Sequence, residues 1–221
     1  MKLSKYKKKI PERIYDILKD RIKELRPCQY KSIDKGLFKD KNLLVCTPTA
    51  SGKTLVAELA ILNAVFHDHG KCIYIVPLRA LASEKYKDFK KFYGDLINIA
   101  ISSGDIDSKD YYLRDYDLII ATSEKFDSLI RHKAPWIEDI KVVVIDEIHL
   151  LNAPERGPTL EIVITLLKDK IKKLQLLGLS ATIGNPEELA EWLDAKLILD
   201  KWRPVKLKKG VYFNNKIEFE E

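Results

Sequence analysis

The chain has 221 residues, of which 46% are hydrophobic and 33% are charged. This balance is that of an ordinary globular protein and excludes a disordered tail protein. The length allows one large domain or two small ones. No apolar run approaches the roughly 20 residues that span a bilayer, and no apolar stretch follows the lysine-rich amino terminus as in a signal peptide. We therefore expect a cytoplasmic protein without a membrane partner.

The chain is basic and contains few cysteines. Lys and Arg number 39 against 33 Asp and Glu, which gives a formal net charge of +6. Such a charge permits a polyanionic partner without requiring one. Cys28, Cys46 and Cys72 are odd in number and form no C-x-x-C pair, which argues against a disulfide framework or a structural zinc site. We expect three reduced thiols.

Two helical segments precede the first predicted strand. The first begins at Pro11 and places the apolar side chains of Ile14, Leu18 and Leu25 on one face. The second covers residues 27–38. Beyond them, short β-branched runs alternate with longer helical patterns. Strands are expected at residues 42–46, 72–76, 97–101, 117–122, 142–146, 174–180 and 196–199, and helices at 53–66, 78–93, 123–131, 159–170 and 186–193.

Most of these strands are continuously apolar, which is typical of a mostly parallel sheet with helices on both faces. The alternation predicts an open α/β fold. The last helix has Asn185 as its expected N-cap, Pro186 in its first turn and Glu188 three residues after the cap. A Lys-rich extended segment at 205–213 is interpreted as the exit from the domain. The predicted parts are a basic tail and helix (1–26), the main domain (27–200) and the exit segment (201–221).

The strongest local signal lies between the first strand and the helix that follows it. The segment matches the phosphate-loop pattern G-x-x-x-x-G-K-[ST], except that Thr47 replaces the first glycine. Backbone N–H groups of such a loop cradle phosphates, Lys53 would reach the β- and γ-phosphates, and Thr54 would hold Mg²⁺. A chance Gly-Lys-Thr at a helix start is the alternative, which the flanking strand and helix disfavour. The candidate nucleotide-binding residues of the loop are Thr47, Pro48, Thr49, Ala50, Ser51, Gly52, Lys53 and Thr54.

A second signal follows the apolar strand at 142–146. Asp146 and Glu147 end this strand, where P-loop NTPases hold Mg²⁺. Asp146 would bind the metal, and Glu147 would orient or deprotonate the attacking water. Acidic residues also end strands as solvated caps, so the pair is a strong signal only together with the phosphate loop.

Six segments in chain order resemble the motifs of superfamily two helicases. They are Gln29 (Q motif), 47–54 (motif I), 77–81 (Ia), 122–125 (Ib), 146–149, which reads D-E-I-H (II), and 180–182 (III). The segments 156–161 and 184–186 further resemble the Ski-type branch. Within it, the archaeal DNA-repair helicases related to the helicase part of polymerase theta fit best. The resemblance extends from about residue 11 to residue 211.

The resemblance implies a RecA-like P-loop NTPase fold and a set of residue roles. Gln29 would recognise the adenine edge, and Lys53, Asp146 and Glu147 would be the catalytic residues at the ATP and Mg²⁺ site. Coupling between nucleotide and strand would fall to three residues, His149, Ser180 and Thr182. Contacts with the phosphate backbone of a single strand would fall to Arg79, Thr122 and Ser123.

The implied function is that of the first motor domain of an ATP-dependent helicase with 3'-5' DNA unwinding. An RNA helicase of the same branch is the nearest alternative. The arginine-rich motif of the family's second RecA-like domain does not occur in this sequence. We therefore expect the amino-terminal part of a longer helicase, with little activity by itself. Two other functions are weighed: an ATP- and strand-binding module without turnover, and a small-molecule kinase, which the D-E-I-H and S-A-T segments disfavour.

Several candidate residues also have ordinary structural explanations. Gln29 could be a solvated helix residue, Thr122 a helix N-cap, and Arg79 the partner of a surface acid such as Glu84. Tyrosines at 111, 112 and 116 could stack on bases but are better explained by loop packing. His67 and His69 flank an aspartate like metal ligands, although the glycine that follows favours a helix end.

Overall fold

The computed structural model describes residues 1–221 except 69, 103–109, 206–207, 209, 214–215 and 220–221. Seven strands form one parallel sheet in the order β3-β4-β2-β5-β6-β1-β7. Their bounds are β1 (Leu43–Cys46), β2 (Lys71–Val76), β3 (Ile99–Ser102), β4 (Leu118–Thr122), β5 (Ile140–Ile145), β6 (Gln175–Ser180) and β7 (Lys196–Leu199). The predicted open α/β sheet is confirmed, and the strand ends differ from the prediction by one or two residues.

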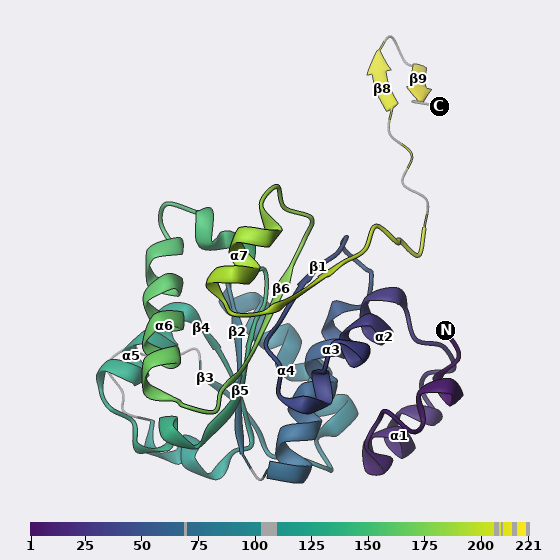
Figure 1. The fold of residues 1–221 in the computed structure, drawn as a ribbon. Coiled ribbons are helices and arrows are strands. Elements are labelled where there is room, and N and C mark those ends of the chain that lie inside the picture. Colours follow the sequence, from purple (N-terminus) through teal and green to yellow (C-terminus); the bar gives the residue numbers. More distant parts are fainter. Residues whose placement is uncertain (69, 103–109, 206–207, 209, 214–215, 220–221) are drawn as a thin grey trace.

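Helices cover both faces of this sheet (Figure 1). One face is covered by α1 (Glu12–Lys19), α2 (Pro27–Asp34), α3 (Lys53–Asn63) and α4 (Arg79–Tyr93). The other is covered by α5 (Ser123–Arg131), α6 (Gly157–Lys170) and α7 (Pro186–Trp192).

Successive side chains of a strand point to opposite faces of the sheet, so the hydrophobic core is divided into two clusters, one under each layer of helices. Leu43 and Val45 belong to the core cluster of the α1–α4 face, and Leu44 and Cys46 belong to that of the α5–α7 face. Both sets are buried, which explains why the strand is continuously apolar rather than alternating.

Helix boundaries differ more from the prediction than strand boundaries do. The predicted helix at 27–38 is wrong at its end: α2 stops at Asp34, and Gly36 takes a left-handed conformation (φ +103°) before a short 3₁₀ turn, Leu37–Lys39. Glycine permits this conformation without a Cβ penalty. The helix from Pro11 also stops early, at Lys19.

Asn185 is the N-cap of α7 and Pro186 lies in its first turn, as predicted, but the expected capping hydrogen bond is absent. Asn185 makes no side-chain bond to the helix backbone. Its amide instead donates a hydrogen bond to the Glu188 carboxylate at 3.1 Å. The two polar side chains thus pair with each other at the surface, and the helix start has no capping box.

Beyond β7 the chain leaves the body of the molecule (Figure 1). A short antiparallel hairpin, β8 (Gly210–Phe213) and β9 (Lys216–Phe219), then stands apart from the sheet (Figure 1). Among the described residues, no helix has the length and apolar character needed to cross a membrane.

Candidate nucleotide and strand site

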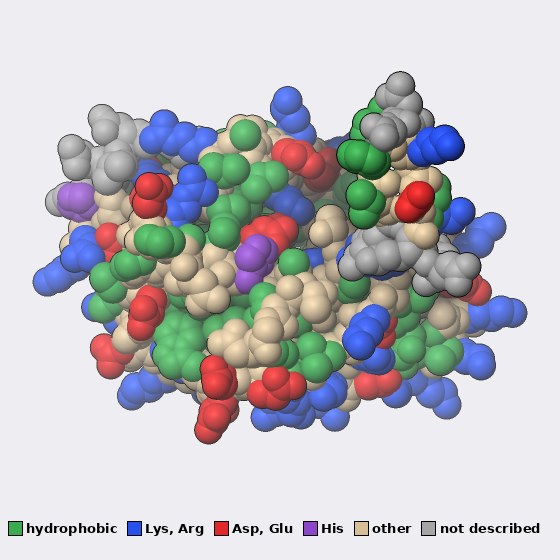
Figure 2. All heavy atoms as spheres, turned by 90° about the horizontal axis from the view of Figure 1, so that it is seen from above, with side chains coloured by type: hydrophobic (Ala, Val, Ile, Leu, Met, Phe, Trp, Pro, Cys, Tyr) green, Lys and Arg blue, Asp and Glu red, His purple; other side chains and the backbone are tan. Residues whose placement is uncertain are grey.

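The phosphate loop and the acidic pair meet at the carboxyl edge of the sheet. The loop follows β1, Asp146 and Glu147 follow β5, and only β6 lies between these two strands. Because parallel strands all end at the same edge, residues far apart in sequence converge there. Figure 2 looks down on this edge, where acidic and basic side chains lie side by side near the middle of the face.

The phosphate loop is shaped by two residues with positive φ, Ala50 at +62° and Gly52 at +95°. A Cβ on Gly52 would lie 2.5 Å from the Gln29 amide nitrogen, so this position needs glycine for space as well as conformation. Thr47, which replaces the usual first glycine, is fully buried, and its hydroxyl lies 2.7 Å from that of Ser51. Its side chain therefore braces the loop from inside.

Lys53 begins α3 behind this loop. Its ammonium donates hydrogen bonds to the carbonyl oxygens of Thr47 (2.8 Å) and Pro48 (3.3 Å). Burial lowers the pKa of Lys53, an effect that the nearby carboxylates of Glu147 and Asp146 oppose. The ammonium is thus held at the loop and can exchange carbonyl partners for phosphate oxygens.

Gln29 is bound to the phosphate loop rather than to solvent, so it is not a solvated helix residue. Its amide nitrogen donates to the Gly52 carbonyl (3.1 Å), and its amide oxygen accepts from the Arg26 backbone N–H (2.8 Å). Arg26 donates to the Ala50 carbonyl at 2.7 Å and lies over the Trp202 ring, 5.4 Å from its centroid. Arg26 lies in the segment that resembles the Q motif, but no role was predicted for it from the sequence, and Trp202 reaches the loop region through Arg26.

Asp146 is surrounded by donors from two other elements and from the backbone of the next residue. Its Oδ2 accepts from the hydroxyl of Tyr74 in β2 (2.9 Å) and lies 3.5 Å from the ammonium of Lys85 in α4. Its Oδ1 accepts from the Glu147 N–H at 3.1 Å. Lys85 also donates to the Thr54 hydroxyl at 3.2 Å. The two predicted metal ligands, Thr54 and Asp146, therefore converge on one ammonium.

Tyr74 and Lys85 were missed by sequence reasoning. A tyrosine in an otherwise aliphatic strand is a usable signal, because a buried hydroxyl needs a partner. Burial, with the Asp146 carboxylate beside it, raises the pKa of Tyr74 well above its ordinary value. Lys85 has no comparable signal, because only the fold brings this helix to the acidic pair.

Glu147 has a left-handed backbone (φ +50°) that is uncommon for a residue with a side chain. Its carboxylate lies 3.3 Å from Nδ1 of His149. Because the Glu147 N–H also donates to Asp146, this contact links Asp146, Glu147 and His149 in one small network. Strained backbone is often found at functional sites, because surrounding contacts must maintain it.

The predicted coupling segment contacts the phosphate loop through its backbone. The Ser180 carbonyl accepts a hydrogen bond from the Thr47 N–H at 3.2 Å. Ser180 is fully buried, whereas Thr182 is exposed. A change at the loop can therefore reach the segment after β6 through one main-chain contact.

The predicted strand-contact residues differ in accessibility. Arg79 is exposed at the start of α4 and forms no salt bridge with Glu84 in the described part of the chain. Thr122 is buried, and its hydroxyl accepts from the Lys125 N–H at 3.4 Å as the N-cap of α5. Ser123 is buried as well. The alternative explanation of Thr122 as a helix N-cap is therefore confirmed.

Ser123 lines a small hollow together with Asp146, Glu147 and Arg156. Arg156 donates to the Pro77 carbonyl at 3.1 Å, so it joins the segment before α4 to the acidic pair. Its position beside the acids is visible only in the fold.

Other candidates lie away from this site. Tyr112 packs edge-on against Tyr116, with 6.2 Å between ring centroids, although Tyr111 and Tyr112 are both exposed. His67 contacts the Asn63 carbonyl, and His69 lies outside the described residues.

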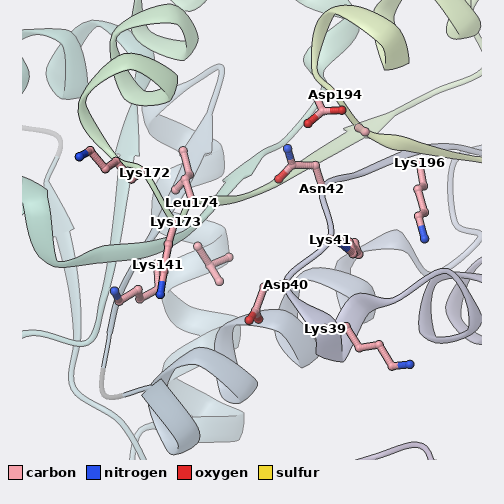
Figure 3. A pocket seen from close by; sticks show the side chains of 12 residues that line it. Lys39, Asp40, Lys41, Asn42, Lys141, Lys172, Lys173, Leu174, Asp194 and Lys196 are labelled. Carbon is pink, nitrogen blue, oxygen red and sulfur yellow. The ribbon is translucent and has the colours of Figure 1, made fainter.

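A hollow of about 820 Å³ opens at the opposite, amino edge of the sheet (Figure 3). It is bordered by six lysines: Lys39, Lys41, Lys141, Lys172, Lys173 and Lys196.

The donor set fits ATP and Mg²⁺. Mg²⁺ prefers oxygen ligands and is usually held by one or two protein groups together with substrate phosphates. Thr54 and Asp146 offer one hydroxyl and one carboxylate at the edge of the loop. Among the described residues, no cluster of three or more His, Cys, Asp or Glu could hold a metal by itself.

A phosphate loop ahead of a buried helix, and an acidic pair ending a neighbouring strand of a parallel sheet, define a P-loop NTPase of RecA-like fold. The family model of the DEAD/DEAH box helicases matches residues 26–189, which is most of the chain. The chain belongs to this family.

Named relatives and solved structures agree with this membership. The chain is 52% identical over 214 residues to the ATP-dependent DNA helicase Hel308 of Pyrococcus horikoshii, a match covering 96% of this chain and 30% of the relative. Identity to the Hel308 of Methanocaldococcus jannaschii is 56%, covering 94% of this chain and 18% of the relative. The DUF1998 helicase MrfA bound to DNA and AMPPNP is similar with a TM-score of 0.72 and 28% identity, over 87% of this chain and 29% of that chain. The chain thus spans less than a third of each of these relatives.

Proposed function

We propose that this chain is the ATP-binding first motor domain of a DNA helicase that unwinds in the 3'-5' direction. The observation that carries the proposal is the convergence of Thr54 and Asp146 on one ammonium beside the phosphate loop. Relatives named ATP-dependent DNA helicases, about half identical to this chain, support it. So does a similar helicase solved with DNA and AMPPNP.

In this proposal each site residue has a distinct task. Lys53 exchanges its carbonyl partners for β- and γ-phosphate oxygens, and Gln29 recognises the adenine edge next to the loop. Glu147 orients the attacking water. When bound, Mg²⁺ neutralises phosphate charge during phosphoryl transfer; Thr54 and Asp146 would hold it.

The proposed partner is single-stranded DNA, gripped through its phosphate backbone. Exposed Arg79 is the best-placed contact, because guanidinium groups bind phosphates without reading sequence. Ser123 and the backbone near Thr122 would contribute less, since both side chains are buried. We further propose that residues 27–200 form the motor domain, that 201–221 lead to a second RecA-like domain of the same polypeptide, and that the protein acts in cytoplasmic DNA repair.

The test is nucleotide binding by Lys53→Ala, measured by calorimetric titration with ATP and Mg²⁺. We expect affinity to fall at least tenfold, with the melting temperature nearly unchanged, because the ammonium lies at the loop and its removal leaves no core cavity. Lys87→Ala, which removes an exposed lysine from α4, is the matched control and should bind ATP like the wild type. Unchanged affinity together with a lowered melting temperature would show that Lys53 is structural, and would contradict the proposal.

A further inference from the structure

The ammonium of Lys85 lies between the two side chains predicted to bind Mg²⁺. It donates a hydrogen bond to Thr54 Oγ1 at 3.2 Å and lies 3.5 Å from Asp146 Oδ2. The side chains of Lys85 and Asp146 are 17% and 14% exposed, so both are largely shielded from water. Because the three residues come from α4, α3 and the end of β5, the contact exists only in the folded chain.

Tyr74, in the neighbouring strand β2, also contacts Asp146. Its hydroxyl donates to the same Asp146 oxygen that faces Lys85, at 2.9 Å, and the side chain is fully buried in β2. The Lys85 ammonium lies 5.7 Å from the centroid of the Tyr74 ring. Both oxygens of the Asp146 carboxylate therefore accept a hydrogen bond, and the nearest cation is one that belongs to the protein.

A divalent cation at this place would compete with Lys85. An ammonium has only donors, so it uses a lone pair of the Thr54 hydroxyl that metal coordination also needs. A cation shared by Thr54 and Asp146 would lie beside the ammonium, and like charges at such short range repel strongly. The two cations cannot both use these oxygens in the arrangement seen here.

We propose that Lys85 is a positioning residue that takes the place of the metal in the nucleotide-free protein and gives way when metal and nucleotide bind. The ammonium keeps Thr54 and Asp146 close together and provides the shielded carboxylate of Asp146 with a positively charged partner. Bound phosphates then supply the extra attraction that lets the metal displace it. This inference rests on the proposed function, because it assumes that these two oxygens are metal ligands.

The experiment measures Mn²⁺ binding to the nucleotide-free protein by electron paramagnetic resonance of the free ion. Mn²⁺ is the probe because it accepts the same oxygen ligands as Mg²⁺. We expect Lys85→Met to bind Mn²⁺ on the order of tenfold more tightly than the wild type, because a neighbouring positive charge is removed. Lys87→Met removes an exposed lysine from the same helix and should leave Mn²⁺ affinity unchanged.

A second variant keeps the test decisive if Lys85→Met folds poorly. Lys85→Gln retains a hydrogen-bond donor without the charge and should also tighten Mn²⁺ binding. Melting curves add a readout that separates positioning from mere packing: without metal, both variants should melt below the wild type, and Mn²⁺ should raise their melting temperatures more than that of the wild type.

Mn²⁺ binding by both variants that is equal to or weaker than that of the wild type would overturn the proposal, as would a failure of both variants to bind Mn²⁺ measurably. Weaker binding would mean that Lys85 supports the metal instead of replacing it. These outcomes are separate from failure of the proposed function, which would show as a wild-type chain that does not bind ATP.

Discussion

Asp146 and Glu147 are adjacent acids with different surroundings. The carboxylate of Asp146 is largely shielded and accepts from Tyr74 beside Lys85, whereas the side chain of Glu147 is more exposed and lies 3.3 Å from His149. The surroundings of Asp146 suit a carboxylate that binds a cation. Those of Glu147 suit a group that acts on a water molecule entering from solvent.

Substitution of these two acids should therefore have unequal effects. Asp146→Asn should weaken Mg²⁺-dependent ATP binding about tenfold or more, because a neutral amide is a poor metal ligand. Glu147→Gln should bind ATP normally but lose hydrolysis, because the amide cannot take up a proton. Titration with ATP in the presence and absence of Mg²⁺, together with a phosphate-release assay, measures both. Equal losses of affinity would mean that the role given to Glu147 is wrong.

A thiol at the end of β1 should make stability sensitive to alkaline pH. Burial raises the pKa of Cys46 to about 11, whereas an unfolded cysteine ionises near pH 8.5. Between roughly pH 9 and 11 the unfolded chain loses this proton while the folded chain keeps it. The free energy of unfolding must then fall as pH rises, by up to about 3 kcal/mol over the window.

Denaturant titrations across that pH range test this effect. The free energy of unfolding of Cys46→Ala should decline less steeply with pH than that of the wild type, by an amount that corresponds to at most one proton. At neutral pH the variant should be less stable, because it has lost a buried side chain. Other buried groups titrate equally in both proteins. Identical slopes would show that Cys46 does not contribute.

At the scale of the element, α6 begins where two backbone segments touch. A Cβ on Gly157 would lie 2.0 Å from the Leu151 carbonyl oxygen, whereas a Cβ on Gly184 would meet nothing within 4 Å. The start of α6 is therefore packed against the turn after the acidic pair, Ile148–Asn152. This contact ties the helix to the site.

Gly157→Ala should consequently destabilise the fold, by about 1–3 kcal/mol as for other overpacked positions. Thermal melts measure the change, with Gly184→Ala as the matched control, expected to stay within about 0.5 kcal/mol of the wild type. Equal melting temperatures for the two variants would contradict the close approach at Gly157. A selective loss of ATP hydrolysis by Gly157→Ala would further indicate that the contact positions the acids.

At the scale of the whole molecule, the question is which positive groups can reach a bound γ-phosphate. Phosphoryl transfer gains about 10³–10⁵ in rate from an arginine finger. Arg26 and Arg156 border the site, but each donates to a backbone carbonyl, that of Ala50 and of Pro77. Neither is free in the arrangement seen here.

We therefore expect the 221-residue chain to bind ATP and hydrolyse it very slowly, without unwinding a duplex. Single-turnover hydrolysis, with and without single-stranded DNA, measures this. The same measurement distinguishes a motor domain from a binding module, since adding a second RecA-like domain should accelerate hydrolysis only in the first case. If the chain alone hydrolyses ATP fast and Arg156→Gln loses this activity, then Arg156 supplies the positive charge that an arginine finger would otherwise provide.

The sequence predicted the order of the strands in the chain and the two loops that carry the chemistry. Buried parallel strands need continuous apolar runs, and a phosphate loop needs glycine before its lysine, so both leave a local signal. Helix ends were predicted less well. The chain turns left-handed at Gly36, and Asn185 bonds to the Glu188 side chain rather than to the helix backbone. Both are local choices that capping preferences alone did not predict.

The amino-acid sequence by itself determined the fold class, the phosphate loop and the acidic pair, because these depend on residues that are adjacent in the chain. Only the tertiary structure decided what surrounds them: that Thr47 braces the loop from inside, that Gln29 binds the loop backbone, and that Tyr74 and Lys85 reach Asp146. The reason is geometric. Parallel strands bring distant segments to one edge, and which side chains meet there is set by strand order and helix packing rather than by spacing along the chain.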